Sequence, residues 1–183
     1  MAKTQQLAAV AMALVLVVGA AGYGIVRGAL SGADGFQQFT SATKGYSIDY
    51  PTGWVVERDK PVLGTGDPLT TDDFVSPDKK ATVDVECVPI RHPLTIDDFL
   101  ENRINVLKLV KFSDPRVEDG RLMVAGTQAP VITYSFTTEG KTTYFSTALI
   151  VKECGWSITI SASTDTKTYR ELFERIARSF QPE

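Results

Sequence analysis

The stretch GYSIDYPTGW, residues 45–54, limits how the chain can fold more than any other. In an extended strand, Tyr46, Ile48 and Tyr50 project from one face, and the polar residues between them project from the other. Three large side chains on one face require a core to pack against. The proline and glycine that follow favour a tight turn, and residues 54–56 begin a second apolar run. The stretch therefore predicts a strand, a tight turn and a second strand.

The remaining sequence predicts mostly antiparallel β-structure. Alternating apolar and polar residues predict strands at 71–76, 80–90, 122–125, 129–137, 142–151 and 156–162. Short turns at 139–141 and 153–155 connect the last three strands as a meander. An antiparallel sheet with one buried face is the expected centre of the domain.

Two segments carry the signals of amphipathic helices. Thr95 followed by Asp98 is a capping box, and apolar residues recur at helical spacing until about Val110. Thr168 and Glu171 predict the same start for a helix at the C-terminus. The order of strands and helices predicts an α+β domain.

The N-terminal region contains an uncharged segment, residues 7–26, between Lys3 and Arg27. As a helix it would span about 30 Å, the hydrocarbon thickness of a bilayer. We favour a retained transmembrane anchor over residues 1–26; the alternative is a signal peptide cleaved near residues 19–21. The lysine before the segment weakly favours a cytoplasmic N-terminus, which places the rest of the chain outside the cytoplasm.

Residues 27–43 are rich in glycine and poor in apolar side chains, which is typical of a linker before a domain at 44–183. The chain of 183 residues has a net charge of −3, so it offers no basic surface for nucleic acid. One histidine and two cysteines exclude a metal site built mainly from these residues, although carboxylate sites for hard cations stay open. We expect no cofactor.

With this order of elements, the sequence resembles the PsbP family of extrinsic photosystem proteins and the wider superfamily that shares their fold. The resemblance covers residues 44–183 and lies in the following positions: Gly45, Tyr46, Ile48, Tyr50, Pro51, Trp54, Ile176, Ser179 and Phe180. It implies an antiparallel sheet sandwiched by helices, in α/β/α order. It also implies a non-catalytic protein that docks on a membrane complex.

The sequence departs from that family at its N-terminus. Plant members of the family carry a soluble extension there, and cyanobacterial relatives carry a lipid-anchoring cysteine, whereas this chain has the apolar segment 7–26 and no cysteine before residue 33. The role of stabilising calcium and chloride near a manganese cluster is therefore not carried over, since fold transfers better than function.

The sequence offers no clear catalytic constellation. His92, the only histidine, lies between Arg91 and Pro93 in a connection from strand to helix, without a nucleophile motif nearby. We therefore expect a surface or capping histidine and a protein that is not an enzyme.

Three groups of carboxylates are candidates for ion binding. Asp72 and Asp73 are adjacent on a predicted strand and should point in opposite directions, while Asp97 and Asp98 are explained by the helix start. The third group, in an expected loop before Gly120, is the better placed for an ion or a partner, although a solvated turn is the simpler interpretation; it comprises Asp114, Glu118 and Asp119.

Three further features bear on partners and compartment. Cys87 and Cys154 could form a disulfide outside the cytoplasm, or stay a buried thiol and an exposed one. Gly24 and Gly28 have the spacing that brings transmembrane helices close together. Two aromatic residues near the linker are candidates for a membrane-side contact, although packing within the domain explains them equally well: Phe36 and Phe39.

The sequence as a whole predicts a single-pass accessory subunit, anchored through residues 7–26, whose domain docks on a photosynthetic or electron-transfer complex. The partner would be an integral membrane complex, photosynthetic or respiratory, contacted from the periplasmic or lumenal side. The alternative is an exported, free-standing envelope protein that binds a small ligand or a transient partner.

Overall fold

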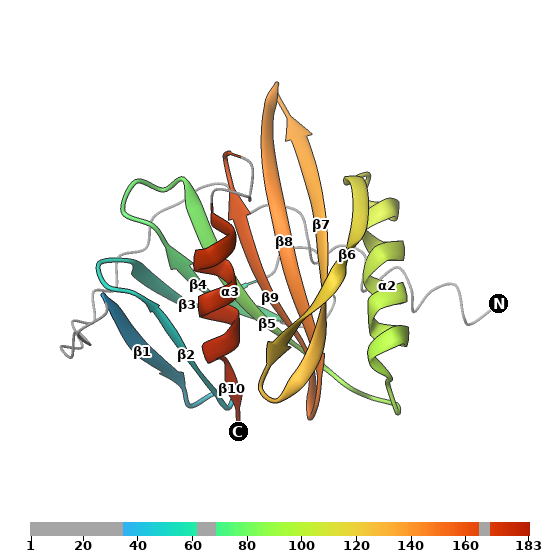
Figure 1. Ribbon diagram of the computed structural model, residues 1–183, viewed down its shortest axis with the longest axis horizontal. Helices are drawn as coiled ribbons and strands as arrows, with labels where there is room; N and C mark the ends of the chain where they lie inside the picture. The colour runs from blue at the N-terminus through green and yellow to red at the C-terminus, as the bar shows by residue number, and fades with distance from the viewer. Residues whose placement is uncertain (1–34, 62–68, 165–168) are drawn as a thin grey trace.

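The structure is a computed structural model that describes residues 35–61, 69–164 and 169–183. Its centre is a seven-stranded antiparallel sheet, accompanied by a three-stranded sheet (Figure 1). The large sheet has the order β3 (Val55–Pro61), β4 (Thr70–Val75), β5 (Ala81–Pro89), β9 (Cys154–Ala162), β8 (Lys141–Val151), β7 (Thr127–Thr138), β6 (Ser113–Val124). The small sheet has the order β1 (Phe36–Ser41), β2 (Tyr46–Pro51), β10 (Gln181–Pro182).

Two helices lie on opposite faces of the large sheet (Figure 1). Helix α3 (Arg170–Ser179) and the small sheet cover the face that we call the front face, where Phe173 and Ile176 join the larger apolar core. Helix α2 (Ile96–Leu109) covers part of the other face, the back face, where Phe99 and Leu107 join a second core. The predicted α+β fold, an antiparallel sheet between helices, is therefore confirmed.

The starts of the two helices differ from each other. Thr95 caps α2 as predicted. Its side chain accepts a hydrogen bond from the Asp98 N–H, and the Asp98 carboxylate accepts one from the Thr95 N–H. Helix α3 begins after Tyr169, whose side chain makes no capping bond. The capping box predicted at Thr168 and Glu171 is therefore wrong, because the N-cap is one residue later than the motif requires.

The linker predicted at residues 27–43 is wrong in its second half. Residues 36–41 form β1, which pairs with β2 so that Phe39 lies opposite Ile48. Phe39 is 5% exposed, and its ring lies 5.3 Å from that of Phe74 on the large sheet. The domain therefore begins before residue 44, because two aromatic side chains in this glycine-rich stretch are enough to place a strand on the core.

The predicted face of the opening strand is confirmed, since Tyr46 and Ile48 are fully buried. The strand after the turn, however, does not pair with it: β2 belongs to the small sheet and β3 to the large one. The turn that contains Gly53, which has a φ of +89°, is therefore a corner between two sheets and no hairpin.

The anchor predicted over residues 1–26 and the first part of the linker lie outside the described residues. Among the described helices, none is long and apolar enough to cross a membrane.

Candidate functional site

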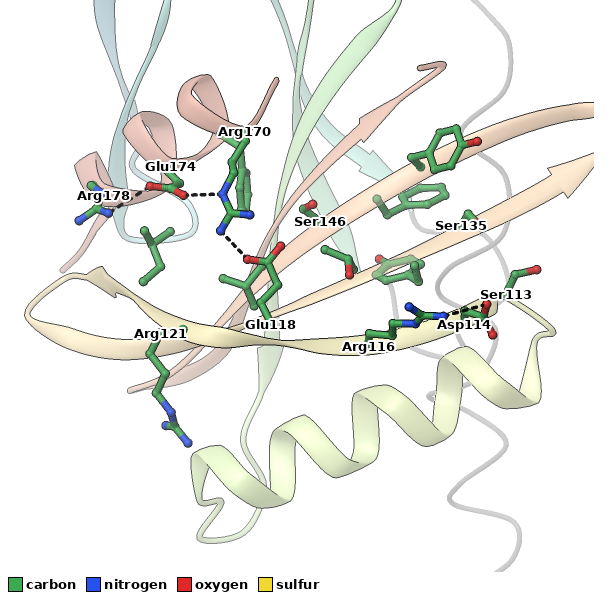
Figure 2. A pocket seen from close by; sticks show the side chains of 18 residues that line it. Ser113, Asp114, Arg116, Glu118, Arg121, Ser135, Ser146, Arg170, Glu174 and Arg178 are labelled. Atoms are coloured by element: carbon green, nitrogen blue, oxygen red, sulfur yellow. Dashed lines mark hydrogen bonds and ion pairs between the residues drawn. The ribbon is translucent and has the colours of Figure 1, made fainter. Parts of the chain in front are cut away.

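A groove of about 440 Å³ opens on the front face, at the end of the large sheet that the small sheet leaves uncovered. Helix α3 forms one wall and the edge strand β6 forms the other, while β7 and β8 make the floor (Figure 2). The lining residues are contributed by segments that lie far apart in the sequence. We refer to this feature as the groove.

The floor of the groove is rich in hydroxyl groups. Thr133 and Ser135 of β7 face Ser146 and Tyr144 of β8, each as a direct cross-strand partner of the other. We call these four side chains the hydroxyl quartet. They lie on the front face because they alternate with side chains that project from the back of the same strands.

One end of the groove is apolar. Leu122, Val131 and Phe173 line it and are almost fully buried, and they belong to the larger core. The groove therefore passes from an apolar end at the core to a hydroxyl-rich end at the surface.

The two walls are joined by a ladder of ion pairs. Arg170 of α3 donates from Nη2 to Glu118 Oε2 on β6, at 2.8 Å, and from Nε to Glu174 Oε1, at 3.0 Å (Figure 2). Arg178 donates to the other oxygen of Glu174, at 3.2 Å. The hydrogen bond from Arg170 lowers the pKa of Glu174, burial opposes this, and the hydrogen bond from Arg178 lowers the pKa further. Glu174 is therefore ionised over the neutral pH range.

The edge strand carries two further arginines. Arg116 lies beside the groove, 77% exposed, and its Nη2 is 3.5 Å from Asp114 Oδ2. Arg121 points away from the groove toward α2, with Nη2 3.7 Å from Asp97 Oδ1 (Figure 2). Of the arginines that line the groove, Arg116 therefore has the most solvent access.

On the back face of the same strands, the hydroxyl groups bond one another. Tyr134 Oη lies 3.0 Å from Thr147 Oγ1, which lies 3.0 Å from Thr159 Oγ1. We call this series the hydroxyl chain. All three residues are buried, and burial raises the pKa of Tyr134 to about 12. Thr159 also hydrogen-bonds the Asp84 carboxylate, so the chain belongs to an internal structural network.

Next to the hydroxyl chain lie buried charges on the back face. Arg103 of α2 donates from Nη2 to Glu86 Oε2 at 3.1 Å, and Ser157 donates to the same oxygen at 3.1 Å. Asp84 lies directly opposite Asp73 on the neighbouring strand. Burial, then the charge of Asp73, raises the pKa of Asp84 well above its ordinary value.

The prediction that Asp72 and Asp73 point in opposite directions is confirmed. Asp72 faces the front, where it accepts hydrogen bonds from Tyr46 Oη at 2.7 Å and Lys44 Nζ at 2.6 Å. Asp73 faces the back, where Lys60 Nζ lies 3.1 Å from Oδ2. The two carboxylates cannot share an ion, and each has a structural partner.

The structure does not bring the three candidate metal ligands together. Asp114, Glu118 and Asp119 lie on strand β6, where a loop was expected; the strand has two register shifts, which hid it in the sequence pattern. Asp114 and Glu118 face Arg116 and Arg170, and Asp119 lies exposed at the surface. Among the described residues, no group of three His, Cys, Asp or Glu side chains could hold a metal ion.

The other candidate residues have separate locations. Gly24 and Gly28 lie outside the described residues. Phe39 is buried in the core and is not available for a membrane-side contact, whereas Phe36 is half-buried beneath the Arg175 guanidinium, 3.8 Å from the ring centroid. His92 is exposed in the connection before α2.

Cys87 and Cys154 are joined by a disulfide bond, with their Cα atoms 5.6 Å apart. The bond links the neighbouring strands β5 and β9 beside the larger core. Of the two alternatives open from the sequence, the bonded pair is therefore the one that the structure has.

Sequence reasoning missed the groove. Its signals are present but weak: the spacing of Arg170, Glu174 and Arg178 gives consecutive pairs four residues apart on a helix, and Thr133 and Ser135 interrupt the apolar side of a strand. Each signal alone is typical of a solvated surface, and only the folded chain brings them together.

No protein-family model and no curated protein matches the sequence. Three solved structures are similar to this chain. Cyanobacterial PsbP from Synechocystis is 18% identical, with 91% of this chain and 99% of that chain covered and a TM-score of 0.49. PA94, a protein of unknown function from Pseudomonas aeruginosa, is 9% identical, with 81% and 97% covered and a TM-score of 0.49. LpqN, involved in cell envelope biogenesis of Mycobacterium tuberculosis, is 13% identical, with 80% and 90% covered and a TM-score of 0.44. The first of these structures is a member of the family that the sequence resembles.

Proposed function

We propose that this chain is a non-catalytic accessory protein that binds a partner protein through the groove, on the extracytoplasmic side of a membrane. The partner is an integral membrane complex, photosynthetic or respiratory, as the sequence led us to expect. The observation that carries the proposal is the groove itself, an open site with a prepared floor and walls on the uncovered end of the front face.

The chemistry of the groove fits a protein partner. Protein interfaces combine an apolar centre with a polar rim, and arginine and tyrosine are enriched in them. Here Leu122 and Phe173 provide the apolar part, Arg116 and Arg170 the rim, and Tyr144 is 37% exposed at the floor. The ion pair from Arg170 to Glu118 holds the two walls in place before binding, which lowers the ordering cost of association.

The disulfide bond supports a location outside the cytoplasm. Disulfides form and persist outside the cytoplasm and are rare inside it. The bond between Cys87 and Cys154 joins two strands of the sheet and so belongs to the fold itself. A domain outside the cytoplasm, held near the membrane by the apolar segment at residues 7–26, accommodates both features.

The test is to capture the native full-length protein from gently solubilised membranes. Wild type is compared with a variant that carries Arg116→Glu and Arg170→Glu, and with the control Lys80→Glu in the exposed turn before β5. We expect wild type and control to recover a membrane complex in equal amounts and the groove variant to recover little. Recovery of the complex by the groove variant as well would contradict docking through the groove.

A small-ligand protein of the cell envelope is the second candidate. The groove volume of about 440 Å³ favours it, because pockets for small molecules measure roughly 300–1,000 Å³. Intact-mass analysis of the captured protein separates the two candidates. A chain cut near residues 19–21 and recovered without a complex would establish the second one, whereas an intact N-terminus with the complex establishes the first.

A further inference from the structure

The hydroxyl quartet is unpaired, although the same strands pair every hydroxyl of the hydroxyl chain on the back face. Among the described residues, the side chains of Thr133, Ser135, Ser146 and Tyr144 make no hydrogen bond. Hydroxyls that line a cavity without internal partners are free to bond a ligand. The floor can therefore donate hydrogen bonds to a group that accepts them.

Arg116, beside the quartet, favours an anion. Three arginines, Arg116, Arg170 and Arg178, line the groove with three carboxylates, so its charges balance in a chain of net charge −3. Arg116 is the direct cross-strand partner of Thr133. A guanidinium has five N–H donors, and these arginines use only part of them in the ion-pair ladder. Arg116 is mostly exposed and holds its carboxylate loosely, at 3.5 Å.

We propose that the groove binds an extended segment of the partner protein that carries an acidic side chain two residues from an apolar one. This inference rests on the proposed function. The carboxylate of the segment lies on the hydroxyls of Thr133 and Ser135, within reach of Arg116. The apolar side chain lies at the other end, against Val131 and Phe173.

The spacing follows from the floor itself. Val131, Thr133 and Ser135 are successive front-face residues of β7, so neighbours among them are about 7 Å apart along the strand. An extended segment aligned with β7 repeats its own side chains at the same interval. Alternate residues of the segment therefore meet the apolar and the hydroxyl-rich parts of the floor in turn.

The test measures binding of two fluorescein-labelled peptides to the full-length protein in nanodiscs, by fluorescence anisotropy. The first peptide is Gly-Ser-Asp-Thr-Leu-Ser-Gly, and the second has Asn in place of Asp. We expect the acidic peptide to bind at least about tenfold more tightly, because charge-assisted hydrogen bonds are about twice as strong as neutral ones. Added salt should weaken its binding.

Variants of the protein test where the acidic peptide binds. Arg116→Gln should weaken the acidic peptide about tenfold and leave the Asn peptide unchanged, and the combination Thr133→Ala with Ser135→Ala should weaken it in the same direction. Lys141→Gln removes an exposed positive charge from the start of β8, next to its turn with β7, and serves as the control. These side chains are exposed or half-buried, so thermal melts should confirm that every variant is folded.

The outcomes separate this inference from the proposed function. Equal affinity for both peptides would contradict the proposed acidic segment. An affinity for the acidic peptide that Arg116→Gln leaves unchanged would contradict it too. Failure of both peptides up to millimolar concentration, while the wild-type protein still captures its complex, overturns it too and leaves the proposed function standing. Failure of capture as well overturns both.

Discussion

Strands β7 and β8 present hydroxyl groups on both faces, and the two faces use them in opposite ways. On the back face, beneath α2, the Thr147 hydroxyl bonds the hydroxyls of both Tyr134 and Thr159. On the front face, the hydroxyl quartet lines a groove and has no side-chain partner in the part of the chain that the structure describes. The comparison teaches that a polar residue on a strand is structural where a helix closes over it, and is available for binding where the cover ends.

The largest expected effect lies in the buried charges of the back face. Arg103→Met leaves Glu86 buried without its ion-pair partner, so the free energy of unfolding should fall by about 3–5 kcal/mol. Urea unfolding followed by the fluorescence of the buried Trp156 measures it. Adding Glu86→Gln to Arg103→Met should recover much of the loss; no recovery would contradict the assignment of the cost to an unpaired charge.

The sharpest test of the comparison changes one hydroxyl on each face. Thr147→Val removes the centre of the hydroxyl chain and leaves the Tyr134 and Thr159 hydroxyls buried without it, so it should cost about 1–3 kcal/mol. Thr133→Val, on the opposite face of the neighbouring strand, should change stability by less than about 0.5 kcal/mol. Equal costs in the same urea unfolding assay would show that the two faces do not differ.

The dependence of stability on pH should also differ between the faces. Asp84 on the back face has a raised pKa, so the native state holds a proton that the unfolded state has released. Stability should therefore fall as pH rises from the unfolded pKa through the native one, by up to about 1.4 kcal/mol per pH unit. Asp84→Asn should remove this fall, as measured by unfolding across the pH range; a slope unchanged by the substitution would contradict the buried proton.

On the front face, the stability that Asp72 contributes depends on pH in the opposite direction. Burial raises its pKa, but hydrogen bonds from Lys44, the Asp59 N–H and Tyr46 outweigh this, and the pKa lies below its ordinary value. The stability that Asp72 contributes is therefore present above the unfolded pKa and is lost as pH falls through the native pKa. Asp72→Asn should flatten the acid limb of the same pH profile, and an unaltered acid limb would contradict this role.

The smallest expected effect on stability is in the groove. Arg116→Gln should leave the melting temperature within about one degree of wild type, because an exposed ion pair contributes little. We expect Arg116→Gln to weaken partner binding instead. A large loss of stability on differential scanning calorimetry would mean that Arg116 holds the fold together and that the groove is no prepared site.

The sequence predicts those parts of the fold that depend on local chemistry. The buried face of Tyr46 and Ile48 follows from alternation, and the start of α2 follows from the contact of Thr95 with Asp98 three residues later. The opposite directions of Asp72 and Asp73 follow from the pleat of a strand. Each of these features lies within a few residues of its cause.

Features that depend on distant segments escaped prediction. The turn at Gly53 has ordinary turn chemistry, and nothing local says that the strands on its two sides join different sheets. Pro115 and Gly120 break the alternation of β6, so this edge strand read as a loop. The groove was missed for the same reason, since Arg170 and Glu118 are 52 residues apart and meet only in the fold.

The central claim, that the open end of the front face contacts a partner, is tested most directly by photocrosslinking in intact membranes. A benzoylphenylalanine in place of Tyr144, on the floor of the groove, is compared with one in place of Lys80, in the exposed turn between β4 and β5 and outside the lining of the groove. Crosslinking from position 144 to a subunit of a membrane complex, and not from position 80, is the predicted result. Crosslinks from position 80 alone, or from neither position, would contradict the account.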